Sequence, residues 1–244
     1  MQVQPIIEVF QKNNHGFHPV VPFDPATDKL MQMDISESNN ELTTAITGNT
    51  PAFCTYIEKK LADQKARYGI GGYNELRNVY SQSKLFGKDD TPSAGAKKGP
   101  KPEEPRRLHI GKDIWGKAGT PVHLFMGGLI HSFKYNAQEG DYGATIIMLH
   151  QLDAKSFYTL YGHLSLADLK NISVGQFITR GEIIGHFGEP HENGNWPPHL
   201  HFQVIVDVEQ KEGDYPGVCK YSEREKYLYN CPDPEWILQL EQFL

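Results

Sequence analysis

From about residue 105 onward, the chain consists of short apolar runs separated by glycine-containing turns. These runs span residues 121–125, 129–135, 144–150, 156–161, 182–186 and 199–208. Runs of this length between turns are typical of strands, and they do not alternate with helices as in βαβ units. The pattern predicts a mainly β fold, an antiparallel sheet in a sandwich or barrel-sandwich hybrid.

One helical pattern precedes this region, at about residues 50–68. Thr50 is expected to cap its N-terminus, Pro51 suits the first helical position, and Gly69 and Gly71 are expected to end it. Residues 1–49, which precede this helix, show no clear pattern and are expected to be extended or irregular.

Apolar side chains almost disappear between the two regions, where four prolines stand among charged residues. Such a segment buries too little surface to offset the entropy of ordering it, so residues 88–104 are expected to form a linker. The chain is thereby divided into an N-terminal region (1–87), a β core (105–208) and a C-terminal helical extension (209–244).

Composition and charge narrow the class of protein. Hydrophobic residues make up 39% of the chain, enough for a core, and the net charge of −6 provides no basic surface for nucleic acid. No apolar run reaches membrane-spanning length, and the N-terminus does not resemble a secretory signal. We therefore expect no membrane span and a cytoplasmic location, or a periplasmic or secreted one if a signal has been removed. Three cysteines without Cys-x-x-Cys spacing argue against a disulfide framework.

Candidate chemistry is found first in the last predicted strand, which contains His199 and His201. Alternation along a strand places both imidazoles on one face and Leu200 and Phe202 on the other. We expect the apolar face to join the core and the two histidines to face outward. A His-x-His pair also arises by chance, so this pair alone is weak evidence.

Two further segments carry suitable side chains. His109 and Asp113 would be about 13 Å apart in an extended chain, but a turn at Gly111 would bring them together, since glycine adopts backbone angles that other residues avoid. His163 follows an apolar strand that is expected to end at Gly162. Two imidazoles and one carboxylate are the ligand set of a catalytic zinc that keeps one position open for water.

Together these motifs, in this order, resemble the lysostaphin-type (LytM-like) zinc endopeptidase family over residues 105–206. The resemblance implies a compact antiparallel β fold, one Zn²⁺ ion per chain held by His109, Asp113 and His201, and catalytic roles for His163 and His199. The motifs that carry it are His109-x-x-x-Asp113, Gly119-Thr-Pro-Val122, Asp141-Tyr-Gly143, Tyr161-Gly-His163-Leu-Ser165, Arg180-Gly181-x-x-x-Gly185 and His199-Leu-His201-Phe202.

The segments 71–80 and 193–203 indicate a particular branch of that family. They resemble the peptidase-like domain that some large proteins carry between a kinase-like domain and a class III aminotransferase domain.

Two residues near the predicted ligands differ from the pattern of the secreted enzymes or lie in a bulky segment beside the site. Lys112 replaces a small apolar residue and would disfavour a metal if it pointed inward. Trp196 is expected to be a packing anchor, with a substrate platform as the alternative.

The sequence thus predicts a zinc-dependent metalloendopeptidase whose partner is a glycine- or D-alanine-containing peptide or muropeptide. The main alternative is a non-hydrolytic LytM-like binding or regulatory module. A third hypothesis is that the first hundred residues cover the groove, with Asn39 or Asn40 at the open metal position. In that case, trimming the chain at the linker should raise activity. The oligomeric state is left open.

Overall fold

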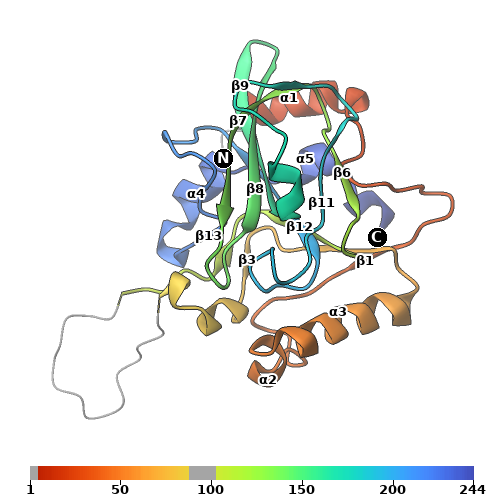
Figure 1. Ribbon diagram of the computed structural model, residues 1–244, viewed down its shortest axis with the longest axis vertical. Helices are drawn as coiled ribbons and strands as arrows, with labels where there is room; N and C mark the ends of the chain where they lie inside the picture. Colours follow the sequence, from red (N-terminus) through yellow and green to blue (C-terminus); the bar gives the residue numbers. More distant parts are fainter. Residues whose placement is uncertain (1–4, 88–102) are drawn as a thin grey trace.

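The computed structural model describes residues 5–87 and 103–244 and shows the mainly β fold that the sequence predicts (Figure 1). The strands of the described part are β1 Leu30–Gln32, β2 Tyr68–Gly71, β3 Glu75–Leu76, β4 Leu108–His109, β5 Lys112–Trp115, β6 Pro121–His123, β7 Gly128–Asn136, β8 Gly143–Leu152, β9 Lys155–Leu164, β10 Phe177–Ile178, β11 Ile183–His186, β12 His199–Ile205 and β13 Val218–Cys219. The helices are α1 Pro5–Asn13, α2 Thr44–Thr47, α3 Thr50–Gln64, α4 Arg224–Asn230 and α5 Glu235–Leu238. No helix in these ranges is long and apolar enough to cross a membrane.

A large sheet dominates the structure, with the strand order β1-β2-β5-β12-β9-β8-β7-β10. The expectation of a purely antiparallel sheet is wrong at one edge, because β1 runs parallel to β2. Strands β11 and β6 form a small sheet, and β13, β4 and β3 form another. The central strands β5, β12 and β9 contain Asp113, both histidines of the His-x-His pair and His163. The topology therefore places predicted site residues from distant parts of the sequence on adjacent strands.

The main hydrophobic core covers one face of this sheet. Leu200, Phe202 and Val204 of β12 all point into it, as alternation along the strand predicts. Helix α1 adds Ile6 and Phe10 to the same core from one end of the molecule (Figure 1). Smaller apolar clusters, to which α3 and the C-terminal segment contribute, pack elsewhere. The apolar positions of β12 thus fix which way its polar positions face.

The N-terminal region is more structured than expected. Residues 1–49 were expected to be irregular, but they contain α1, β1 and α2. Helix α3 ends at Gln64 rather than near residue 68, with Lys65 in the left-handed conformation after it. It ends early because residues 68–71 pair with β5 as strand β2. The N-cap of α3 is Asn49, not Thr50: the Asn49 side chain accepts a hydrogen bond from the backbone of Ala52.

Of the predicted domain divisions, the linker at 88–104 lies almost entirely outside the described residues, and the boundaries remain a prediction. The C-terminal extension does contain two short helices, α4 and α5 (Figure 1).

Candidate active site

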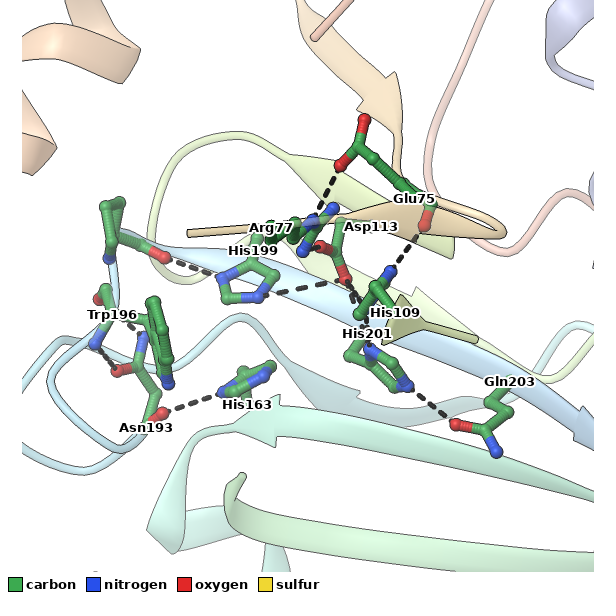
Figure 2. A network of polar contacts seen from close by, with 12 residues as sticks. Glu75, Arg77, His109, Asp113, His163, Asn193, Trp196, His199, His201 and Gln203 are labelled. Atoms are coloured by element: carbon green, nitrogen blue, oxygen red, sulfur yellow. Dashed lines mark hydrogen bonds and ion pairs between the residues drawn. The ribbon is translucent and has the colours of Figure 1, made fainter. Parts of the chain in front are cut away.

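All five predicted site residues converge on one small volume (Figure 2). His201 on β12 lies opposite Asp113 of β5 on one side and opposite Gly162 of β9 on the other. His109 enters from the neighbouring small sheet. None of the five side chains is more than 6% exposed.

The three predicted metal ligands form a tight triangle of donor atoms. His109 Nε2 lies 2.9 Å from His201 Nδ1 and 3.4 Å from Asp113 Oδ1, and His201 Nδ1 lies 3.2 Å from the same oxygen. Ligands at tetrahedral positions around zinc are separated by about 3.3 Å when each bond is about 2 Å. The triangle therefore has the dimensions of one face of a zinc site.

Hydrogen bonds fix the tautomers of both histidine ligands. His109 Nδ1 lies 2.7 Å from the carbonyl oxygen of Gly72, which only accepts, so this nitrogen carries the proton. His201 Nε2 lies 2.9 Å from Gln203 Oε1, and the amide nitrogen of Gln203 donates elsewhere, so the proton of His201 is on Nε2. The lone pairs of His109 Nε2 and His201 Nδ1 therefore face each other, and they repel each other unless a cation lies between them. Hydrogen bonds from the outer ring nitrogens to fixed acceptors are usual for metal-bound histidines.

The carboxylate of Asp113 is bound on both sides. Oδ1 faces the two histidines, whereas Oδ2 accepts a hydrogen bond of 2.7 Å from Arg77 Nη1. Burial raises the pKa of Asp113, but His109 and Arg77 outweigh that effect and hold it well below its usual range. Asp113 is therefore an anion at neutral pH, as a metal ligand must be.

His199 stands beside this triangle with a free lone pair. Its ring stacks on the indole of Trp115, with 4.0 Å between ring centroids, and its Nδ1 donates to the Pro197 carbonyl at 2.7 Å. Burial lowers the pKa of His199 to about 4, so the ring is neutral at pH 7. Its Nε2, 4.0 Å from Asp113 Oδ1, is therefore an acceptor beside the triangle.

His163 reaches the site through a distortion of its strand. The expectation that the strand ends at Gly162 is wrong, because β9 continues to Leu164. His163 has φ of 61°, in the left-handed region, and the register of β9 against β8 shifts here. Tyr161 and Leu164 both face the main core, so the extra residue lets His163 turn away from it, with its ring centroid 4.1 Å from that of His199. A strained backbone at a side chain of this kind is a common feature of functional sites.

Two geometric expectations need correction. His199 and His201 do share one face, but that face is not open to solvent: they are 3% and 2% exposed. Residues of the N-terminal region, among them Phe53 and Tyr80, line the cavity above them. Gly111 was expected to adopt a backbone conformation that other residues avoid, but its φ is not positive. A Cβ there would lie 2.3 Å from His201 Cε1, so glycine is required for space.

Two side chains whose direction the sequence left open, those of Lys112 and Trp196, are placed by the structure. Lys112 points away from the cavity and binds the carboxylates of Glu235 and Glu241 at 3.1 and 2.6 Å. The side chain of Trp196 packs between Phe53, Tyr80 and His163, as a packing anchor would.

Asn39, which was expected as a metal-blocking residue, is engaged elsewhere. Its amide donates to the Asp34 carbonyl and the Tyr56 hydroxyl, and neither Asn39 nor Asn40 lines the cavity. The hypothesis that either asparagine occupies the metal position is therefore wrong. The N-terminal region does lie over the site, as that hypothesis expected, because Phe53 and Tyr80 line the cavity.

Sequence reasoning missed three residues that hold the ligands: Gly72, Arg77 and Gln203. Gln203 has a detectable signal, because alternation along β12 puts it on the face of His201. Gly72 and Arg77 lie in the segment 71–80 that marks the family branch, but that resemblance does not place them beside the ligands, because only the pairing of β2 and β3 with the ligand strands brings them close.

Such a site, two histidines and an aspartate with two further histidines beside them on a β-sheet, is the kind found in metal-dependent hydrolases. Residues 107–213 match the sequence model of Peptidase family M23. This match covers less than half of the chain, and it agrees with the family resemblance found in the sequence.

Several characterised proteins are similar to the chain. The L-Ala--D-Glu endopeptidase of Bacillus subtilis (strain 168) is 29% identical over 129 residues, which are 51% of this chain and 37% of that protein. The chain thus spans little more than a third of the length of this relative. The catalytic domain of the antimicrobial peptidase lysostaphin from Staphylococcus simulans is 21% identical, with a TM-score of 0.37 over 71% of this chain and 97% of that one. A zinc containing peptidase from Vibrio cholerae is 25% identical, with a TM-score of 0.33 over 51% and 35% of the two chains.

Proposed function

We propose that the protein is a zinc-dependent metallopeptidase that hydrolyses amide bonds of short peptides. The observation that carries the proposal is the triangle of His109, Asp113 and His201, whose donor atoms all lie within 4.8 Å of one another. Both histidines of the triangle hold their ring proton on the nitrogen that points away from it. The M23 domain match over the same residues supports it.

The chain's own residues would divide the chemistry as follows. Zinc, when bound, would lower the pKa of a coordinated water toward about 7 and polarise the scissile carbonyl. His199 would take the proton of the attacking water at Nε2, because that nitrogen is unprotonated and its Nδ1 is held by Pro197. The low pKa of His199 means that its ring would release the proton again readily.

His163 would stabilise the negative charge that develops on the carbonyl oxygen. Its Nδ1 donates to the Asn193 carbonyl at 2.8 Å, so the neutral ring has no proton at Nε2. Donation from Nε2 therefore requires the imidazolium form, which burial and the neighbouring His199 disfavour by lowering the pKa. His163 would accordingly receive at Nε2 the proton that His199 has taken from the attacking water, which returns His199 to its neutral form, and would donate a hydrogen bond from Nε2 to the carbonyl oxygen.

The substrate we propose is a peptidoglycan-type peptide. The relative from Bacillus subtilis is an L-Ala--D-Glu endopeptidase, and the sequence resemblance favours glycine- or D-alanine-containing peptides. The cavity of about 100 Å³ in the present structure is much smaller than a peptide, so the side chains of Tyr80 and Phe86 above it would have to move to admit one.

The test is a measurement of zinc content together with cleavage of pentaglycine, muropeptides and an L-Ala-D-Glu peptide, with and without a chelator. We expect close to one zinc per chain and cleavage of at least one peptide that the chelator abolishes and added zinc restores. A protein without zinc would contradict the proposal. Zinc without cleavage of any peptide would identify the alternative, a non-hydrolytic LytM-like module.

A further inference from the structure

A short segment of the N-terminal region, residues 68–77, lies beside two of the ligands. Its strand β2 pairs with β5 in the large sheet, and its strand β3 pairs with β4 in the three-stranded sheet. In the sheet register, Gly71 lies opposite Asp113, and Glu75 lies opposite His109. The family match begins at residue 107, so this segment lies outside the matched residues.

Arg77, directly after β3, is the residue through which this segment contacts Asp113. Its side chain is 3% exposed, and its Nη1 donates to Asp113 Oδ2 at 2.7 Å (Figure 2). Its Nε donates to Glu75 Oε2 at 2.6 Å, and Nη1 also lies 3.1 Å from the Tyr80 hydroxyl. The guanidinium is thus held in one orientation by several partners, and a planar group held in this way presents its N–H bonds in fixed directions.

Gly72 supports the same arrangement through its lack of a side chain. Its carbonyl accepts the His109 Nδ1 proton, and its φ of 102° favours glycine. A Cβ at this position would lie 2.1 Å from Arg77 Nη2 and 2.9 Å from His109 Nδ1. The backbone at Gly72, the Arg77 side chain and the His109 ring are therefore packed too closely for any other residue at position 72.

We propose that Arg77 is a positioning residue of the metal site, which holds Oδ2 of Asp113 so that Oδ1 alone faces the metal. This inference rests on the proposed zinc function. A carboxylate with one oxygen held by a guanidinium binds a metal through the other oxygen only, and its orientation is set before the metal arrives. Without Arg77, the carboxylate can rotate or bind through both oxygens, and a buried oxygen loses its partner.

The ordinary alternative is that Arg77 forms an ion pair that only stabilises the fold. That alternative predicts loss of stability on mutation but no change in the geometry of the metal once it is bound. The positioning role predicts a change in both the affinity for zinc and the coordination. The two are therefore distinguished by measurements on the metal itself.

The experiment uses the full chain with Arg77→Met and Arg77→Lys, and Arg67→Met as a matched control. Arg67 also donates to an aspartate, Asp28, in the same N-terminal region, but it is 42% exposed and does not line the cavity. Zinc affinity is measured by competition with a chromophoric chelator, and the visible spectrum of the cobalt-substituted protein reports the coordination geometry. Outer-sphere partners of metal ligands typically account for 10–100-fold in affinity.

We expect Arg77→Met to weaken zinc binding about 100-fold and Arg77→Lys about 10-fold, because lysine keeps the charge but lacks the planar fork. Both should alter the cobalt spectrum, and Arg67→Met should change neither quantity. If Arg77→Met does not fold, Arg77→Lys decides the question on the same two measurements. Zinc affinity and a cobalt spectrum equal to those of the wild type in a folded Arg77 variant would overturn the inference. Failure of the wild-type chain to bind zinc would instead overturn the proposed function.

Discussion

Gln203 follows His201 by two residues on the same face of β12, and its side-chain oxygen lies 2.9 Å from His201 Nε2. The amide nitrogen of Gln203 donates to the Pro216 carbonyl at 3.1 Å and to Cys231 Sγ at 3.3 Å. The amide is thereby prevented from rotating, so it always presents its oxygen to His201. The tautomer of a proposed zinc ligand is thus set by the C-terminal part of the chain.

Replacing Gln203 by leucine should weaken zinc binding. The His201 ring would then have no acceptor for its Nε2 proton and would be free to place that proton on Nδ1, the nitrogen that faces the metal. We expect a 10–100-fold loss of zinc affinity in a chelator competition titration. Gln203→Glu keeps an acceptor and should lose less than Gln203→Leu. Equal affinities for the two variants would show that the hydrogen bond does not set the tautomer.

Replacing His199 by alanine should separate catalysis from metal binding. His199 is not one of the three residues whose donor atoms form the triangle, so zinc content should be unchanged. Peptide cleavage should fall about 10²–10⁴-fold, because a general base contributes rate of that order. His201→Ala should instead lose zinc.

A control for both histidine variants is His15→Ala, at an exposed position. It should retain zinc and activity. Loss of zinc from His199→Ala would assign that residue to the metal, whereas full cleavage by the same variant would remove it from the mechanism.

The fold and the centre of the site could be predicted because local rules govern them. Leu200, Phe202 and Val204 must enter the core, so alternation along β12 fixes the face of His199 and His201. All six predicted strands are present in the structure. The strand β2 was not predicted, since Gly69 and Gly71 were interpreted as the end of the preceding helix, whereas the segment Tyr68–Gly71 forms a strand by pairing with β5.

Properties that depend on the third dimension were missed or misjudged. The histidine face looked exposed because a sequence does not show what covers a sheet, and here Phe53 and Tyr80 do. Arg77 was not identified as a site residue, since its contact with Asp113 joins positions 36 residues apart. The left-handed backbone of His163 gives no signal in the sequence either, because it follows from the register shift between β8 and β9.

Removing residues 1–102 should inactivate the protein rather than activate it. If the N-terminal region were only a cover, its loss would expose the site and raise activity. It also supplies strands β1 and β2 to the main sheet, and Gly72 and Arg77 to the ligands. We therefore expect residues 103–244 to bind zinc at least 10-fold more weakly than the full chain and to lose cleavage. Circular dichroism, zinc titration and the peptide assay measure this, and a higher kcat/KM in the shortened chain would contradict it.

His150 should make stability depend on pH between about 4 and 6.5. This buried side chain, remote from the metal ligands in sequence, donates to the Gly127 carbonyl and lies 2.8 Å from the Thr159 hydroxyl. Burial lowers its pKa to about 4, whereas an unfolded histidine has a pKa near 6.5. Below pH 6.5 the unfolded state binds the proton and the folded state does not. The stability is therefore fully present above pH 6.5 and is lost as the pH falls toward 4.

The measurement is urea unfolding of the wild type and of His150→Gln at pH 7.5 and pH 5. Glutamine keeps hydrogen-bonding groups but does not titrate, so subtracting its pH dependence removes the contributions of the other histidines. The wild type should lose about 2 kcal/mol more than His150→Gln between the two pH values. If both proteins lose the same free energy of unfolding, the pKa of His150 is not lowered in the folded state, and its burial is relieved by water or by local opening.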